Sequence, residues 1–174
     1  MNFEYYSQIL NQNMRYIEEI ESKKSELNKI KSLSELSPEP FSPQFNTSWL
    51  KEKLLGRKAP LKTLLLDQRI CAGVGNIYAD EACYLARLLP TRPAGSLDQK
   101  EIFRLVRSIK KVLRSAIKDM GTTIRNYKTT SEEPGDYQPK VYGREGEPCP
   151  RCGKRIVRVV KGGRSSYFCP GCQK

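Results

Sequence analysis

Apolar residues recur every three to four positions through much of this chain, which is the spacing of an amphipathic α-helix. The clearest example runs from residue 96 to residue 121, where Ser96 and Gln99 are expected to form a capping box and Gly121 to end the helix. This predicted helix has one apolar face and an opposite basic face. The apolar face consists of Ile102, Leu105, Val106, Ile109, Val112, Leu113 and Ile117, and the basic face of Arg104, Arg107, Lys110, Lys111, Arg114 and Lys118.

Shorter helical patterns precede this segment. One begins at Thr47 and ends at Gly56, and the next has Pro60 in its first turn, where the fixed φ of proline suits a helix. A third is predicted from Asn76 to Leu88, after a glycine-rich entry. Together with 96–121 they predict a helical domain over residues 47–128.

The first 46 residues have a different character. Residues 1–32 fit a helical stripe only loosely, so we expect a helical extension that is marginal unless it docks on something. Three prolines between positions 38 and 43 predict an extended linker over residues 33–46. The apolar positions of the extension are Tyr6, Ile9, Leu10, Ile17, Ile20, Leu27 and Ile30.

The end of the chain changes from helical to β-type patterning. Residues 129–140 form a polar loop without apolar periodicity. In residues 141–174, the runs "RIVRVV" and "SSYFC" lie on either side of "KGGR". Gly162 and Gly163 permit the positive φ angles of a tight turn, so we predict a β-hairpin there.

Two CxxC pairs, separated by sixteen residues, enclose this hairpin. Two thiolates three residues apart on a tight turn can face one metal ion, and two such turns complete a tetrahedron. Zinc is favoured over iron because nothing else indicates electron transfer, and four protein ligands make one structural Zn²⁺ the expected cofactor. The predicted fold is therefore mainly α with a small β zinc ribbon. The ligands are Cys149, Cys152, Cys169 and Cys172, whereas Cys71 and Cys83 are expected to be small buried residues.

The charge of the chain is unevenly distributed. Residues 1–48 hold 5 Lys/Arg against 7 Asp/Glu, and residues 49–174 hold 26 against 12, so net charges of −2 and +14 make up the total of +12. A surplus of this kind attracts a polyanion, most often nucleic acid, although a solvated basic surface is the plainer interpretation.

Two absences from the sequence restrict its function. The chain has no histidine, which excludes Ser-His or Cys-His nucleophiles and His-ligated catalytic metals. Apolar runs such as residues 64–66 are far too short to cross a membrane, and no signal-peptide pattern opens the chain. We therefore expect a soluble cytoplasmic protein with no membrane partner.

Two glycine-containing turns could bind phosphate. Gly73 and Gly75 precede a helix that starts near Asn76, and the free amides and dipole of a helix N-terminus attract an anion. Lys161 and Arg164 flank the hairpin turn and could meet a phosphate backbone. The alternative for the first turn is that its glycines serve close packing, and for the second that it is an ordinary basic turn. Residue patterns alone leave both alternatives open.

The segments "DQRICAGVGNIYADEACYLARLLPTRPAGSL" and "KVYGREGEPCPRCGKRIVRVVKGGRSSYFCPGCQK" resemble two parts of the formamidopyrimidine-DNA glycosylase and endonuclease VIII family. These are its helix–two-turn–helix and its C-terminal zinc finger. "LSPEPFSPQF" is similar to the linker that precedes the family's helical domain. The resemblance spans Leu33 to Lys174, is closer to the formamidopyrimidine branch, and implies a helix–two-turn–helix bundle followed by a four-cysteine zinc-finger hairpin.

The resemblance also implies a function and a set of DNA contacts. The family excises oxidised purines from DNA and then cleaves the strand at abasic (AP) sites. The implied partner is therefore double-stranded DNA that is damaged or abasic. Asn76 with Gly75 in the GVGN turn, Tyr142 and Arg164 are expected to hold phosphates beside the everted nucleotide, and Lys62 to help position the DNA. The implied location is the bacterial cytoplasm, in association with the nucleoid.

The chain departs from the family pattern at the residues that perform catalysis. The family uses an N-terminal proline as its nucleophile, whereas this chain begins Met-Asn-Phe-Glu and has no proline among its first 37 residues. No catalytic residue is therefore assigned. We expect the DNA-binding region of such an enzyme, not catalytic alone, with a separate chain as a possible source of the N-terminal domain. A non-catalytic interaction module and a weak lysine-based AP lyase are the alternatives.

Overall fold

The computed structural model describes residues 22–23, 35–122 and 135–174 of the chain. The chain divides into two compact units, residues 1–36 and 37–174. The helical extension predicted over residues 1–32 lies outside the described residues, apart from residues 22–23, which are helical. The fold is therefore described for the second unit.

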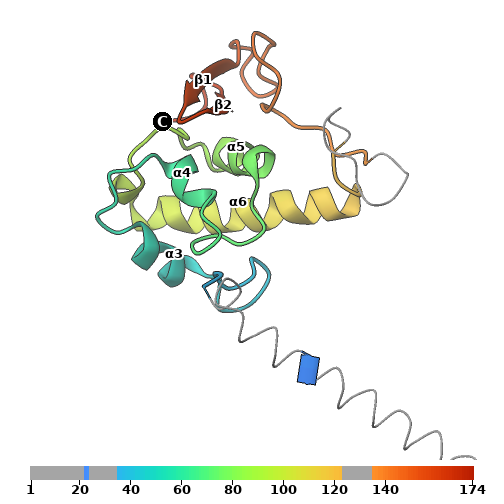
Figure 1. Cartoon of the computed structure of the whole chain (residues 1–174). Coiled ribbons are helices and arrows are strands. Elements are labelled where there is room, and N and C mark those ends of the chain that lie inside the picture. The colour runs from blue at the N-terminus through green and yellow to red at the C-terminus, as the bar shows by residue number, and fades with distance from the viewer. Residues whose placement is uncertain (1–21, 24–34, 123–134) are drawn as a thin grey trace, which may run out of the picture. The chain divides into compact units, whose positions relative to one another are not determined.

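Helices make up the first part of this unit (Figure 1). They are α3 (Thr47–Leu54), α4 (Leu61–Leu65), α5 (Asn76–Ala86) and α6 (Gln99–Lys118), and a 3₁₀ turn, Ala94–Ser96, precedes α6. Both α3 and α5 pack against α6, while α4 packs against α5. The four helices predicted between residues 47 and 121 are thus present, and the mainly α class is confirmed.

The predicted capping box of α6 is wrong in its residues. Asp98 accepts a hydrogen bond from the Glu101 amide, and the Glu101 carboxylate accepts one from the Asp98 amide. Ser96 cannot take this role because it belongs to the 3₁₀ turn, where its hydroxyl donates to the Pro93 carbonyl at 2.8 Å. At the other end Gly121 has a φ of 90°, as the predicted stop requires.

The apolar face of α6 lies in the main core. Leu105 and Ile109 are fully covered, whereas Ile117 is 67% exposed, so the predicted apolar face ends one turn early and Ala116 takes the buried position. Across the core, Leu50 of α3 and Leu65 of α4 are also fully buried. Burial of one leucine side chain contributes about 1.5–3 kcal/mol, so this cluster is the main support of the helical part.

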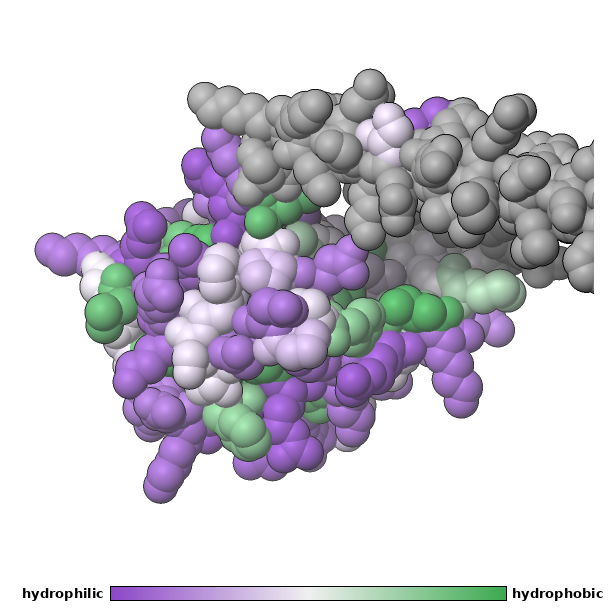
Figure 2. All heavy atoms as spheres, turned by 90° about the horizontal axis from the view of Figure 1, so that it is seen from below, coloured by the Kyte–Doolittle hydropathy of each residue, from purple (hydrophilic) through white to green (hydrophobic). Residues whose placement is uncertain are grey.

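The outer surface of the unit is predominantly polar. Figure 2 shows one side of the molecule, where hydrophilic residues cover most of the described surface and hydrophobic ones lie in small groups between them. Large apolar patches mark docking surfaces on soluble proteins. Among the described residues visible on this side, the hydrophobic ones form separate small groups and not one large patch.

The predicted hairpin is confirmed in the C-terminal part. Strand β1 (Val157–Lys161) pairs antiparallel with β2 (Arg164–Phe168), and Lys161 lies opposite Arg164. Gly162 and Gly163 have φ values of 58° and 73°, which is the pair of positive angles that a two-residue turn of this hand requires. The hairpin packs against α5 through β2.

Candidate metal centre and anion-binding surface

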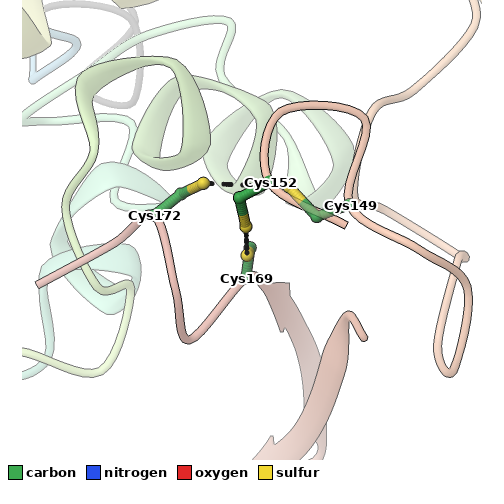
Figure 3. Close-up of side chains that lie close together, drawn as sticks. All are labelled: Cys149, Cys152, Cys169 and Cys172. Atoms are coloured by element: carbon green, nitrogen blue, oxygen red, sulfur yellow. Dashed lines mark hydrogen bonds between the residues drawn. The ribbon is translucent and has the colours of Figure 1, made fainter. Parts of the chain in front are cut away.

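Four cysteine side chains converge beside the hairpin (Figure 3). Their sulfur atoms all lie within 4.8 Å of one another, with 3.8 Å between Cys149 and Cys172 and 3.4 Å between Cys152 and Cys169. A tetrahedron with Zn–S bonds of about 2.3 Å has edges of about 3.8 Å, so the spacing fits a four-thiolate zinc site. The four ligands leave no open coordination position, and the zinc is structural.

The zinc-binding turns are docked on helix α5. The Tyr84 hydroxyl lies 3.4 Å from the Cys149 sulfur. Arg151 donates to the Tyr84 carbonyl at 3.0 Å and places its guanidinium 4.2 Å from the Tyr84 ring. Near the C-terminus, the buried Gln173 donates to the carbonyl of Leu88 at 2.8 Å. These contacts fix the ribbon to the helical part.

A buried ion pair makes a second set of contacts between the helical part and the zinc ribbon. Lys62 and Asp80 are 3% and 0% exposed, and their charged groups are 2.8 Å apart. The Lys62 ammonium also donates to the Ser165 carbonyl, while Asp80 accepts the amide of Tyr167 at 2.9 Å. Burial raises the pKa of the Asp80 carboxyl to about 6, against the opposing effect of Lys62, and burial lowers the pKa of Lys62. The pair therefore holds β2 against α4 and α5.

The carboxylate of Glu81 makes a third set of contacts, between α5 and the segment before the zinc ribbon. It is 2% exposed and accepts three successive backbone amides, from Lys140 at 2.9 Å, Val141 at 2.8 Å and Tyr142 at 3.0 Å. Backbone N–H groups that all point at one carboxylate satisfy its charge without a cation. Glu81 thereby fixes the segment that leads into the zinc ribbon.

Two of the predicted DNA contacts meet at the start of α5. The Asn76 side-chain amide donates to the Tyr142 hydroxyl at 3.1 Å, and the Tyr142 ring packs edge-on against Tyr167 at 5.0 Å. Gly75 is the N-cap of α5 and provides no side-chain cap, so the first amides of this helix have no side chain to satisfy them there. Asn76 Oδ1 is buried without a hydrogen-bond partner among the described residues. The Asn76 side-chain NH₂ and the Tyr142 hydroxyl, from two distant segments, thus lie together beside a helix N-terminus.

Arg164 lies at the tip of the hairpin, beside a cavity of about 300 Å³. Lys161 and Arg164 line it from the hairpin, and Pro60, Thr63 and Pro90 line it from the helical part. No ion pair among the described residues involves either hairpin cation, so both charges are available to an anionic ligand.

Lys62 differs from the other predicted DNA-contact residues in its position. Its ammonium is buried and held by Asp80 and Ser165, so it is not placed to meet DNA directly. Because Ser165 adjoins Arg164, an effect of Lys62 on DNA binding would act through the position of the hairpin. Sequence reasoning missed Asp80 and Glu81. The available signal was two adjacent carboxylates within a predicted helix of small and apolar residues.

Cys71 and Cys83 are 0% exposed members of the main core, as predicted. Burial raises the pKa of the Cys71 thiol to about 12 and raises that of Cys83 as well. Their thiols therefore stay protonated near neutral pH and take no part in metal binding.

Replacement of Glu81 tests its contacts with the backbone amides of residues 140–142. Glu81→Gln retains the shape of the side chain but removes the charge and turns an NH₂ group toward three backbone amides. We expect the free energy of unfolding to fall by about 2–3 kcal/mol in urea titrations. Glu52→Gln is the control, because the Glu52 side chain is 73% exposed and its loss should cost less than about 0.5 kcal/mol. Equal effects of the two substitutions would show that the Glu81 contacts do not stabilise the fold.

These features define a class of protein, in which a helical domain with a glycine-rich helix entry carries a four-cysteine zinc ribbon. Residues 36–128 match the family model for the formamidopyrimidine-DNA glycosylase H2TH domain, and residues 146–174 match the model for the zinc finger found in FPG and IleRS. The chain belongs to the formamidopyrimidine-DNA glycosylase family.

Individual relatives agree with this assignment. The formamidopyrimidine-DNA glycosylase of Pelotomaculum thermopropionicum is 48% identical over 150 residues, covering 85% of this chain and 54% of that protein. The crystal structure of the MutM (Fpg) protein of Thermus thermophilus is 47% identical, with a TM-score of 0.79 over 84% of this chain and 57% of that one. A Lactococcus lactis Fpg bound to DNA containing an abasic site is 38% identical, with a TM-score of 0.75 over 80% of this chain and 52% of that one.

The chain spans about half the length of the curated relatives that it matches. The matched half contains the helical domain and the zinc finger. Within the described residues, no helix is both long enough and apolar enough to cross a membrane.

Proposed function

We propose that this chain binds double-stranded DNA, damaged or abasic, as the C-terminal region of a formamidopyrimidine-type base-excision repair protein. The observation that carries the proposal is the contact of Asn76 with Tyr142 at the uncapped start of α5. Gly75 supplies the close approach there, and Arg164 supplies a charge on the zinc-supported hairpin. These groups would hold phosphates of one strand, while Lys62 positions the hairpin.

Two kinds of observation support DNA as the partner. Residues 49–174 carry a net charge of +14, which favours a polyanion. Several similar solved structures are Lactococcus lactis Fpg complexes with DNA that contains an abasic site or a modified base. Phosphate contacts of this kind determine where the protein sits on DNA but carry no sequence preference.

We further propose that the 174-residue chain excises no base by itself. The residues that match the family belong to its helical domain and its zinc finger, and the Lys62 amine is buried in an ion pair. The family's N-terminal domain, on the same or on a separate chain, would complete the enzyme. Its place would be the bacterial cytoplasm, on the nucleoid. A non-catalytic interaction module and a weak lysine-based AP lyase are the competing functions.

Borohydride trapping on abasic-site DNA distinguishes these functions. An amine that attacks the abasic aldehyde forms a Schiff base, which reduction converts into a stable covalent adduct. We expect salt-sensitive binding without a trapped adduct. An adduct in good yield would establish the lyase, and absence of DNA binding at low salt would leave the interaction module.

Substitution of Arg164 tests the hairpin contact. Arg164→Ala removes one charge-assisted phosphate contact, so we expect affinity for an abasic-analogue duplex to fall at least about tenfold. The slope of log K against log salt should decrease by about 0.9. Lys100→Ala is the control, because it removes the same charge from an exposed position at the start of α6. Equal losses in the two variants, with zinc retained, would contradict a specific role for Arg164.

A further inference from the structure

Helix α6 carries a basic face that the proposed DNA contacts do not use. Its cations recur on one side along some four turns, and they share no residue with the start of α5 or the hairpin tip. No ion pair of the described residues involves any of them. The set consists of Arg104, Arg107, Lys110, Lys111, Arg114 and Lys118.

Such a face weakens the helix that carries it. Arg107 lies three and four residues from Lys110 and Lys111, and Arg114 lies four from both Lys110 and Lys118. Like charges at these spacings repel each other across the helix surface. An anionic partner would relieve the repulsion.

A shallow, open groove lies along the basic face. A cavity of about 490 Å³ runs along it, and its lining contains five cations and no acidic residue. Apolar side chains contribute as well, because Leu85 of α5 lies in the lining and Phe103 is 51% exposed beside it. A ligand for this groove needs negative charge together with an apolar group.

Aromatic rings hold two of the arginines in place. The guanidinium of Arg107 lies 5.6 Å from the Phe103 ring centroid, and that of Arg114 lies 5.4 Å from Phe41, which is 42% exposed. Arginine and aromatic side chains are the types enriched at the centres of protein interfaces. Because Arg107 already lies over the Phe103 ring, a nucleic-acid base would have to displace it in order to stack there.

We propose that this groove, bounded by α6 and the end of α5, is a docking site for an acidic peptide segment of a partner protein. Carboxylates of the segment pair with the arginines and lysines, and an aromatic or aliphatic side chain enters between Leu85 and Phe103. Recognition of this kind combines an apolar anchor with a charged rim.

The experiment uses the full chain and a fluorescein-labelled peptide of about 14 residues, rich in Asp and Glu, with Phe at positions i and i+4. We expect salt-sensitive binding that falls at least about tenfold in R107E/R114E and also falls in Phe103→Ala. The double variant should melt at a higher temperature than the wild type, because each new glutamate lies four residues before a lysine. Loss of binding in a more stable protein cannot be attributed to misfolding.

Controls separate the partner classes. K51E/K58E changes the net charge by the same amount as R107E/R114E, but at exposed positions outside the groove. It should leave peptide affinity within about twofold of the wild type. Affinity for an abasic-analogue duplex should change equally in the two double variants. The proposal is overturned if the peptide does not bind, if a peptide without Phe binds equally well, or if R107E/R114E loses duplex affinity as Arg164→Ala does. Tighter binding of a single-stranded oligonucleotide to this face would assign it to nucleic acid.

Discussion

Removal of zinc should unfold the ribbon and leave the helices folded. A hairpin of two five-residue strands is marginal alone, and the small cluster around Val141 and Ile156 includes two of the zinc ligands. Zinc binding to such sites is worth about 10–16 kcal/mol at neutral pH, which is comparable with the whole stability of a domain. The main core around α6 contains no zinc ligand and should survive.

The test combines a strong chelator with Cys169→Ser. Far-UV circular dichroism should retain its helical signal, while amide exchange in residues 157–168 becomes fast and affinity for duplex DNA is lost. Cys71→Ala is the control, because Cys71 is a buried core residue outside the metal centre, so zinc content and ribbon protection should persist. Loss of the helical signal together with zinc would show that ribbon and helices form one cooperative unit.

Lys62→Met should destabilise the protein by about 3–5 kcal/mol, because it leaves the Asp80 carboxylate buried without its cation. The hairpin should also loosen, since the Ser165 carbonyl loses its donor. Equilibrium unfolding in urea measures the first effect. The double variant K62M/D80N should recover part of the loss, because a neutral side-chain oxygen can still accept the Tyr167 amide.

The penalty of Lys62→Met should depend on pH. Burial raises the folded-state pKa of Asp80 to about 6, above its ordinary value of 3.8. A carboxyl with a raised pKa favours the fold while protonated, and this stability is lost as the pH rises through the folded-state value. Without the Lys62 ammonium the pKa of Asp80 rises further. The loss of stability caused by Lys62→Met should therefore be larger near pH 8 than near pH 5.

A surface pair provides the matched control. Lys53 and Glu52 lie 3.6 Å apart with side chains 33% and 73% exposed, so Lys53→Met should cost no more than about 1 kcal/mol. If Lys62→Met costs as little, the buried pair does not hold the hairpin to the helices.

Local patterns in the sequence were sufficient for the elements themselves. The apolar spacing of residues 102–113 predicts the buried face of α6, and the two CxxC pairs predict the metal centre, because both depend on neighbours within a few residues or on a repeated turn. The helix cap was missed because Ser96 is drawn into a turn with Pro93.

The contacts between the helical part and the zinc ribbon could not be predicted in the same way. Lys62 meets Ser165 across 103 residues, and Glu81 meets Val141 across 60, so only the folded arrangement brings these groups together. The meeting of Asn76 and Tyr142 across 66 residues is of the same kind. Resemblance to a family implied their shared role, which remains a prediction.

A scan of single uncharged methylphosphonate linkages through an abasic-analogue duplex tests most directly whether Asn76, Tyr142 and Arg164 hold particular phosphates. The wild-type chain should lose affinity about tenfold at one or two adjacent linkages beside the abasic analogue and little elsewhere. Asn76→Ala and Arg164→Ala should bind more weakly throughout and show little further loss at those linkages. A small, uniform loss at every linkage, the same in all three proteins, would contradict the account.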